Sequence, residues 1–241
     1  MNDILRSLYE RKSVRAFTGK SISPEKKAAI LRAAAEAPTA GNQQLYTILD
    51  ITDRGLKESL VPLCDNQPFI AKAEMVLIFL ADCRKWYRAF SAEGLAGRAP
   101  GPGDLMLAAS DANIAAQNAV CAAESLGIGS CYIGDIMENA EALRELLKLP
   151  KWVFPAAMLV FGYPTQQQTS RPKPRRCAMK HIVHENGYRD MDSSELREML
   201  GWNAGERNYS DWLRSFCDFK FNSDFSREMS RSVKEYWKDF E

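Results

Sequence analysis

A short basic segment near the N-terminus carries side chains suited to binding an anion. Arg11-Lys12-Ser13-Val14-Arg15 places three cations and one hydroxyl within five positions. A phosphate monoester offers up to two negative charges and several acceptor oxygens, which guanidinium, ammonium and hydroxyl donors satisfy together. The segment therefore indicates a phosphate site, with the solvated end of a helix as the ordinary alternative.

A second basic segment follows Gly162-Tyr163-Pro164 much later in the chain. Arg171-Pro172-Lys173-Pro174-Arg175-Arg176 carries four cations on a stretch that its prolines keep extended. Side chains at Lys173 and Arg175 project to the same side of such a stretch. Alone this segment predicts a solvated loop, and together with the first one it predicts the other half of an anion site.

Two uncharged segments are candidates for ligand contact. One is a loop of small and amide side chains at 37–44, and the other is an apolar strand bracketed by glycines at 127–135. Glycine lets a flat ligand approach Tyr132-Ile133-Gly134, with a main-chain N–H facing a ring heteroatom. A bulged core strand is the alternative. Because the third glycine falls five residues after the second, the nucleotide-binding G-x-G-x-x-G pattern is absent.

Hydrophobic periodicity predicts the elements that position these segments. Ile4, Leu5 and Leu8 form one face of a short helix that ends at Arg11, and Ser23-Pro24 begins a second helix that Pro38 terminates. The remaining pattern predicts strands at 46–51, 75–80, 127–135 and 153–161, and helices at 54–63, 83–90, 105–126 and 138–147.

The segment before the longest helix is rich in residues that break regular structure. Glu93 to Asp104 contains four glycines and two prolines, and we expect it to be a mobile loop or lid. The helix at 105–126 is Ala-rich and predicted to be central and buried. Its polar interruptions argue against a membrane span and favour contacts across a subunit interface: Asp111, Asn113, Gln117, Asn118 and Glu124.

Composition excludes several classes of function. The chain has 241 residues, 46% hydrophobic content and a net charge of +1, so no general field favours nucleic acid or an anionic membrane. Its longest apolar runs are too short to span a bilayer. Six scattered cysteines without C-x-x-C pairs favour a reducing, cytoplasmic setting. His181 and His184 lack a third ligand in the sequence, so we expect no metal site.

Four of these features resemble the flavin-dependent nitroreductase family in order and spacing. They are the R-x-S-x-R turn at 11–15, the A-P-T-A-G-N-x-Q loop at 37–44, the G-x-G-S-C-Y-I-G segment at 127–134, and K-P-R at 173–175. The resemblance spans roughly residues 4–180. It implies an α+β fold, with a mixed, mostly antiparallel sheet flanked by helices, assembled as an intertwined homodimer with FMN at the interface.

The sequence also predicts a division of the chain into two parts, because the residues from about Met191 onward are rich in Trp, Tyr and Phe. Residues 1–190 would form the FMN-binding domain. Residues 191–241 would form a helical, aromatic-rich arm that packs on the core or on the partner subunit.

The resemblance also implies roles for individual residues. Arg11, Ser13, Lys173 and Arg175 would hold the FMN phosphate, with Lys12 contributing main chain or charge. Arg15 would face the N1 and C2 carbonyl edge of the ring, where reduction places negative charge. The remaining contacts would come from the 37–44 loop, from a side chain before the second strand and from the glycine-bracketed strand: Pro38, Thr39, Ala40, Asn42, Gln44, Gln67, Tyr132, Ile133 and Gly134.

The implied activity is a ping-pong reaction. NADH or NADPH would pass hydride to the flavin, and a nitroaromatic, quinone or similar small molecule would then take the electrons. Because the cofactor carries the chemistry, no catalytic side chain is required. Asp135 stands where the NADPH-preferring branch has a second glycine, so the choice of nicotinamide stays open. The alternatives are a flavin-binding redox sensor or FMN carrier without turnover, and a specialised dehalogenase or dehydrogenase.

Overall fold

The computed structural model describes all residues from Met1 to Glu241. They form two compact units, which are described separately below. The first contains Met1–Pro172 together with Glu228–Glu241, and the second contains Lys173–Arg227. These limits differ from the predicted parts, 1–190 and 191–241, and that division stays a prediction.

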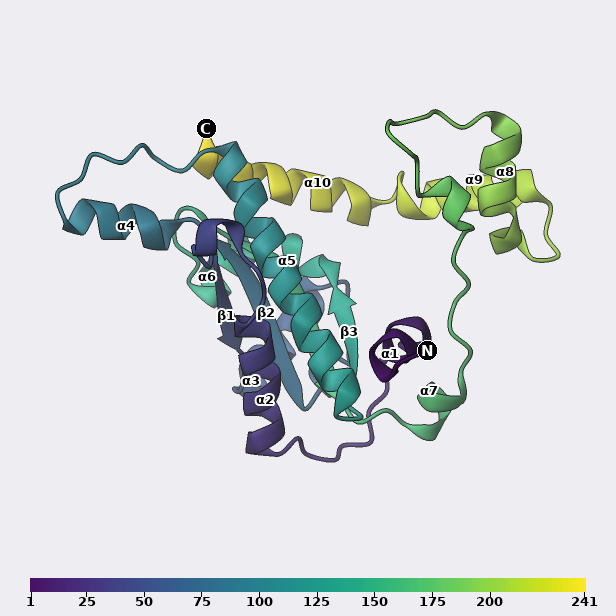
Figure 1. Ribbon diagram of the computed structural model, residues 1–241, viewed down its shortest axis with the longest axis horizontal. Coiled ribbons are helices and arrows are strands. Elements are labelled where there is room, and N and C mark those ends of the chain that lie inside the picture. The colour runs from purple at the N-terminus through teal and green to yellow at the C-terminus, as the bar shows by residue number, and fades with distance from the viewer. The chain divides into compact units, whose positions relative to one another are not determined.

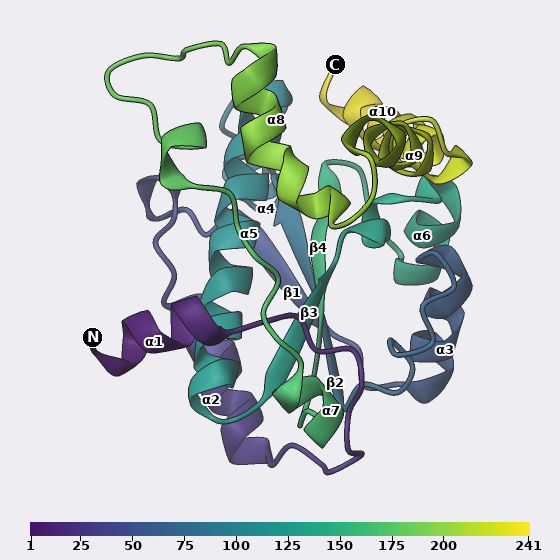
Figure 2. The same cartoon turned by 90° about the vertical axis from the view of Figure 1, so that its right-hand side faces the viewer.

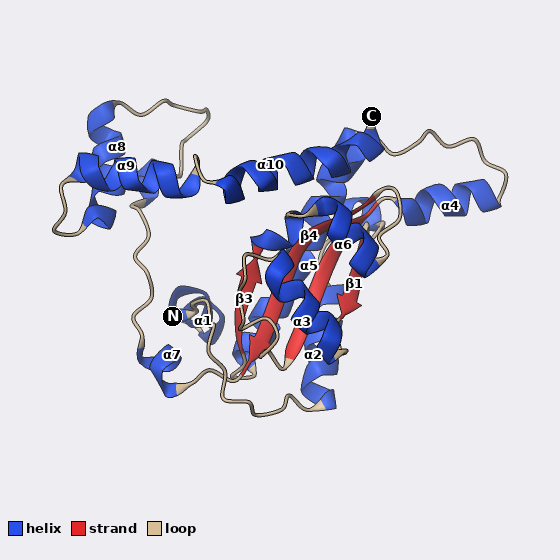
Figure 3. Ribbon diagram, turned by 180° about the vertical axis from the view of Figure 1, so that it is seen from behind, coloured by secondary structure: helices blue, strands red, loops and turns tan.

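A four-stranded antiparallel sheet forms the centre of the first unit. Its order is β1-β2-β4-β3, and its strands are drawn in red in Figure 3. Every residue of β2 and β4 is buried, as continuous apolar runs predict. The bounds are β1 Tyr46–Asp50, β2 Met75–Asp82, β3 Gly129–Ile133 and β4 Val153–Gly162.

These strands confirm the predicted α+β fold and mostly antiparallel sheet. The one parallel pairing outside the named strands is an isolated bridge between Ser13 and Ser130. β3 pairs with β4 in an unbroken register from Gly129 to Ile133. The alternative of a bulged strand at this position is therefore wrong, and the single register shift of the sheet lies between Phe79 and Leu80.

Helices cover both faces of this sheet (Figure 2). On one face α5 packs against α2, and on the other lie α3 and α6. Six alanines of α5 are fully buried, so the helix approaches the sheet and α2 closely. The bounds are α2 Pro24–Ala35, α3 Arg54–Leu63, α5 Pro102–Ser125 and α6 Ala140–Leu147.

The outer face of α5 differs from the prediction of a helix buried nearly all round. Met106, Leu107 and Ile114 are 60%, 50% and 41% exposed. The short helix α1, Asp3–Glu10, also leaves its apolar side chains exposed. The chain therefore carries apolar surface on two helices that contact one another.

An arm projects from the sheet between β2 and α5 (Figure 1). It contains α4, Arg84–Ala92, and an irregular segment that ends where Pro102 occupies the first turn of α5. The last residues of the predicted 93–104 loop are therefore helical. Arg98 forms an ion pair with Asp104, whose carboxylate also accepts from Gly101 N at 2.8 Å. No helix combines the length and the apolar character needed to cross a membrane.

The end of the chain returns to the first unit. α10, Asp224–Trp237, and the turn Lys238–Phe240 bring Tyr236 into the core, where its hydroxyl donates to Ala140 O at 3.3 Å. Arg144 pairs with Asp239 at 2.6 Å. Helix α6 is thus tied to the C-terminus. A short helix, α7 Gln166–Ser170, follows β4.

The second unit is helical. Its bounds are a turn at Met179–His181, α8 Ser193–Gly201, a turn at Trp202–Ala204 and α9 Tyr209–Lys220. Trp212 is the buried centre, with its ring 5.5 Å from that of Phe216 and 6.0 Å from that of Tyr209. Asp192 and Glu195 form a capping box at the start of α8.

Candidate functional site

The basic segment lies along β3, which brings two of the predicted site segments together. Val14 N donates to Ser130 O at 2.9 Å. A Cβ atom at Gly129 would lie 2.5 Å from the Val14 side chain, and one at Gly162 would lie 2.6 Å from Phe17. Only glycine admits so close an approach. The two glycines therefore set residues 11–17 against the ends of β3 and β4.

A reciprocal clamp fixes the basic segment from the other side. Lys12 Nζ donates to Thr169 O at 2.7 Å and also to Arg171 O. In return, Arg171 Nη2 donates to Ser13 O at 2.7 Å. The Lys12 ammonium thus holds the chain, in keeping with a supporting rather than a direct role at an anion. The sequence did not predict that Arg171 contacts Ser13, and the only signal for it was its place in the basic segment 171–176.

Arg11 is the strongest sign of an anion site. Its Nε is buried and has no hydrogen-bond partner in the structure, and Arg171 Nε is in the same state. A buried guanidinium N–H without an acceptor costs about 1–3 kcal/mol or more. An anion with several acceptor oxygens would satisfy this donor.

Arg11, Ser13 and Arg15 lie close enough to β3 to affect the pKa values of its side chains. Burial raises the pKa of the Cys131 thiol, while Arg15 and Ser13 beside it oppose that rise. Burial also raises the pKa of Tyr132 to about 12, opposed by the charge of Arg11. The three predicted ligands thus lie along one short stretch of β3.

The predicted contact strip Tyr132-Ile133-Gly134 has one open position. Ile133 is buried, and the Tyr132 hydroxyl donates to Gln117 Oε1 of α5 at 3.3 Å. Nothing lies within 4 Å of the position that a Cβ atom would take at Gly134. A flat ligand can therefore approach the main chain at Gly134, where β3 ends.

Gln67 lies next to this strip, although it comes from the turn after α3. Its Nε2 donates to Asp135 Oδ2 at 2.7 Å and to Cys64 O at 3.2 Å. The side-chain nitrogen is therefore engaged by the protein. The amide oxygen is the part of Gln67 left for a ligand.

A buried carboxylate, Asp111, organises the 37–44 loop. Asp111 is 3% exposed and accepts from the Thr39 hydroxyl, from Ala40 N at 3.0 Å and from Leu45 N at 3.2 Å. Thr39 Oγ1 accepts in turn from Gln44 N at 2.8 Å. Sequence reasoning assigned Asp111 to polar contacts of the long helix and missed this role.

The backbone of the loop requires its residue types. Gly41, Asn42 and Gln44 have φ of 56°, 55° and 52°, in the left-handed region that glycine and asparagine tolerate best. Pro38, Asn42 and Gln44 are exposed. The loop thus holds its buried side on α5 at Asp111 and presents its other side chains outward.

The remaining predicted ligands lie in the second unit. The Arg175 guanidinium lies 5.6 Å from the centre of the Trp202 ring. Lys173 and Arg175 follow Arg171 by two and four residues in the sequence. Their pairing with Arg11 and Ser13 stays a prediction.

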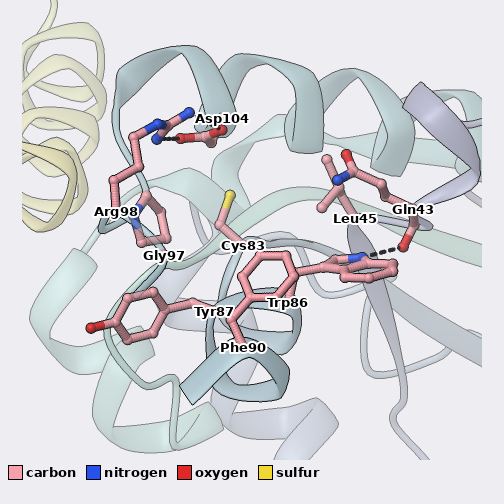
Figure 4. Close-up of a pocket in the computed structure, with 10 residues that line it drawn as sticks. Gln43, Leu45, Cys83, Trp86, Tyr87, Phe90, Gly97, Arg98 and Asp104 are labelled. Carbon is pink, nitrogen blue, oxygen red and sulfur yellow. Dashed lines mark hydrogen bonds and ion pairs between the residues drawn. The ribbon is translucent and has the colours of Figure 1, made fainter. Parts of the chain in front are cut away.

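A cavity of about 330 Å³ lies between the 37–44 loop and the projecting arm (Figure 4). Trp86 donates from Nε1 to Gln43 O at 2.8 Å, which joins α4 to the loop. The irregular segment predicted as a lid contributes part of the wall. The lining residues are Gln43, Leu45, Cys83, Trp86, Tyr87, Phe90, Gly97, Arg98, Pro100 and Asp104.

One known family matches the part of the chain that carries these segments. The family model described as "Nitroreductase family" matches residues 8–163, which include the basic segment, the Asp111-held loop and β3. The chain belongs to the nitroreductase family.

Individual relatives are similar over most of their length. An FMN reductase [NAD(P)H] of Bacillus subtilis is 30% identical over 98% of this chain and 92% of the relative. An oxygen-insensitive NADPH nitroreductase of Salmonella typhimurium is 36% identical over 81% of this chain and 79% of the relative. A solved nitroreductase structure from B. subtilis superimposes with a TM-score of 0.83 at 26% identity, covering 98% of each chain.

Proposed function

We propose that the protein is an FMN-dependent oxidoreductase that uses NADH or NADPH to reduce a small acceptor such as a nitroaromatic or a quinone, by a ping-pong sequence. The observation that carries the proposal is the buried, unpartnered Nε of Arg11 beside Ser13 and Arg15. The relatives named FMN reductase [NAD(P)H] and NADPH nitroreductase support the choice of cofactor and donor.

The residues present fit FMN. Arg11 and Ser13 supply a guanidinium and a hydroxyl for the phosphate, and Lys173 and Arg175 add two further cations. The open position at Gly134 admits a flat ring. When bound, FMN supplies the hydride and electron-transfer chemistry.

Arg15 has a different task from the phosphate ligands. We assign it to the N1 and C2 carbonyl edge of the ring, where a fixed guanidinium stabilises the negative charge of the reduced state. Its backbone N–H donates to Gln168 Oε1 at 3.2 Å, which anchors its main chain, and its side chain lies beside the Cys131 thiol of β3. Arg15 thus sets the electrostatics of the ring.

The other predicted contacts form a second group around the ring. The 37–44 loop, Gln67 Oε1 and the strip at the end of β3 supply hydrogen bonds and apolar cover. These residues are Pro38, Thr39, Ala40, Asn42, Gln44, Gln67, Tyr132, Ile133 and Gly134. They orient the ring and exclude water from its reacting face.

The homodimer belongs to the same proposal. Met106, Leu107 and Ile114 of α5 lie exposed, and so do Ile4 and Leu5 of α1. Monomeric proteins rarely leave such contiguous apolar surface open. Sedimentation should give a dimer, and Ile114→Glu should shift it toward monomer, whereas the matched exposed substitution Asn113→Glu should shift it less.

A cytoplasmic location is also proposed. All six cysteines are free thiols in the structure. Such use of cysteine is typical of reducing compartments.

The decisive experiment is anaerobic reduction of the purified yellow protein. NADH or NADPH should bleach the bound flavin, and a nitroaromatic or quinone should restore its colour. Flavin that binds but resists both nicotinamides would instead indicate a flavin sensor or carrier. A strong preference for a halogenated phenol would indicate a dehalogenase.

Two arginine variants test the division of labour. Arg15→Ala should leave FMN partly bound and slow its reduction, whereas Arg175→Ala should mainly weaken FMN retention through loss of a charge-assisted phosphate bond. Arg176→Ala is the control, because Arg176 is exposed and donates to main-chain carbonyls of its own segment. Equal loss of flavin in the first two variants, with unchanged reduction of the remaining holoenzyme, would refute the assignment.

A further inference from the structure

Two acidic side chains meet in the short turn that continues β3. The turn, Gly134–Met137, carries Asp135 and leads to Glu138. Glu138 is only 5% exposed, and its Oε1 is buried without a hydrogen-bond partner. Glu138 N donates to Asp135 O at 3.1 Å, so the two acids lie on one tight turn, and their carboxyl groups interact with each other. Two ionised carboxylates so placed would repel each other.

The surroundings offer Glu138 no cation. Asp65 and the buried thiol of Cys64 face it from the end of α3, and Glu228 faces it from α10. Glu228 itself forms an ion pair with Arg231 and accepts hydrogen bonds from the Ser232 hydroxyl and from Asn139 N, the latter at 3.1 Å. No group of three or more metal-binding side chains has the geometry to hold an ion. A proton is the remaining way to neutralise this site.

We propose that Glu138 is protonated in the neutral protein and donates its O–H to the Asp135 carboxylate, and that this shared proton, with the Gln67 amide on the other Asp135 oxygen, fixes the turn that positions Gly134. Glu138 is a positioning residue, because it acts on the flavin site through the backbone of the turn. The role in flavin binding rests on the proposed function, whereas the shared proton does not.

Three observations support this arrangement independently of any ligand. Asp135 Oδ2 already accepts from Gln67 at 2.7 Å, so its carboxylate is held in a fixed position. Asn139 has a left-handed backbone, with φ of 48°, which keeps Glu138 outside the helix that follows. Burial, followed by the charge and hydrogen bond of Asp135, raises the pKa of Glu138 to about 8.

The proposal gives the flavin site a dependence on alkaline pH. Above the pKa of Glu138 two carboxylates face each other in a buried turn, and the turn must move to separate them. Gly134 begins that turn, so its main chain moves as well. If only the protonated form binds flavin, the fraction of competent protein falls about tenfold between pH 7 and pH 9.

The first test measures the proton directly, in full-length protein without added flavin. With ¹³C-carboxyl-labelled glutamate, one resonance should titrate near pH 8, and that resonance should be missing in Glu138→Gln. Asp135→Asn should lower its midpoint, because the neighbouring charge is removed. The proposal is overturned if all glutamate resonances titrate below about pH 6, as unperturbed carboxyls do.

The second test measures FMN affinity by fluorescence quenching at pH 7 and pH 9. Wild type and the exposed control Glu145→Gln should lose about tenfold, whereas Glu138→Gln, which keeps a neutral donor, should change little. A parallel loss in all three proteins would overturn the positioning role. Failure of every protein to bind FMN at either pH would contradict the proposed function alone, since the resonance titration would still decide the shared proton.

Discussion

The 37–44 loop and the 134–139 turn are each organised by one buried acid, and the two acids are treated in opposite ways. Asp111 accepts hydrogen bonds from Thr39, Ala40 and Leu45. Glu138 has an unpartnered oxygen and an acidic neighbour. The first acid is surrounded by hydrogen-bond donors, whereas the second faces another carboxyl group that would repel it if both were ionised.

The difference predicts that the two regions respond differently to pH. The loop is held by hydrogen bonds that converge on one carboxyl group. The turn is held by a proton, so its shape depends on pH. Both regions border the proposed flavin site, and only the 134–139 turn makes that site sensitive to pH.

The largest expected effect is on the loop. Asp111→Ala removes the acceptor of several buried donors, and we expect a loss of about 3–5 kcal/mol in the free energy of unfolding, measured in urea at neutral pH. Ser110→Ala, the exposed neighbour on the same helix, should stay within about 0.5 kcal/mol of wild type. A loss below about 1 kcal/mol for Asp111→Ala would mean that the loop does not depend on this carboxylate.

The second expected effect is a fall in the stability of the folded protein as the pH rises, caused by Glu138. The folded pKa of Glu138 is about 8, above its ordinary value of 4.5. The unfolded chain therefore releases this proton earlier, and stability falls as pH rises from about 4.5 to about 8. Glu138→Gln should remove that slope and gain on the order of 4 kcal/mol relative to wild type between pH 5 and pH 9. Unfolding midpoints of the two proteins that run in parallel across this range would contradict it.

A third, smaller effect is expected where the basic segment meets β3. Gly129→Ala places a Cβ atom 2.5 Å from the Val14 side chain. We expect a loss of about 1–3 kcal/mol in stability, together with weaker FMN retention. Gly103→Ala is the matched control, because its Cβ atom meets nothing within 4 Å and alanine favours the helix. The double variant Val14→Ala, Gly129→Ala should bind FMN better than Gly129→Ala alone.

The smallest expected effect on stability comes from Glu141 of α6 and Glu228 of α10, which both form ion pairs with Arg231. Hydrogen bonds from Arg231 lower the pKa of both Glu141 and Glu228 to about 2. Their contribution is present above about pH 4.5 and is lost as the pH falls toward 2. Because Arg231 is 44% exposed and solvent screens its ion pairs, Arg231→Gln should lower the stability only slightly at pH 7. Acid unfolding beside the exposed control Arg227→Gln would measure it.

The sheet and most helices were predictable because their signals are local. The run Met75 to Leu80 is apolar at every position, and β2 extends it by two residues. Ser23 and Pro24 start α2 where capping predicts. α7 was missed because Gln166–Ser170 has no apolar face, and its only signal is the Thr165 cap. The helix predicted at 138–147 begins later because Asn139 is left-handed.

The sequence motifs predicted which segments would be neighbours in the candidate site, but not the contacts that hold them there. Arg11, Ser13 and the end of β3 are neighbours, as the motifs suggested. The contacts that hold them join positions far apart in the chain: Arg171 with Ser13, and Asp111 with Ala40. No periodicity in a single sequence links such positions. Glu138 was counted as part of a helix, since only its burial beside Asp135 distinguishes it from a solvated acid.

The position of the basic segment along β3 has a consequence for solubility. β3 is an outer strand of the sheet, and Ser13 and Val14 occupy part of its free edge through the bridge to Ser130. An uncovered edge strand is a template for pairing with another chain. The proposed cofactor-binding segment therefore also blocks aggregation. A variant that releases this segment should precipitate through β3 as well as lose its flavin.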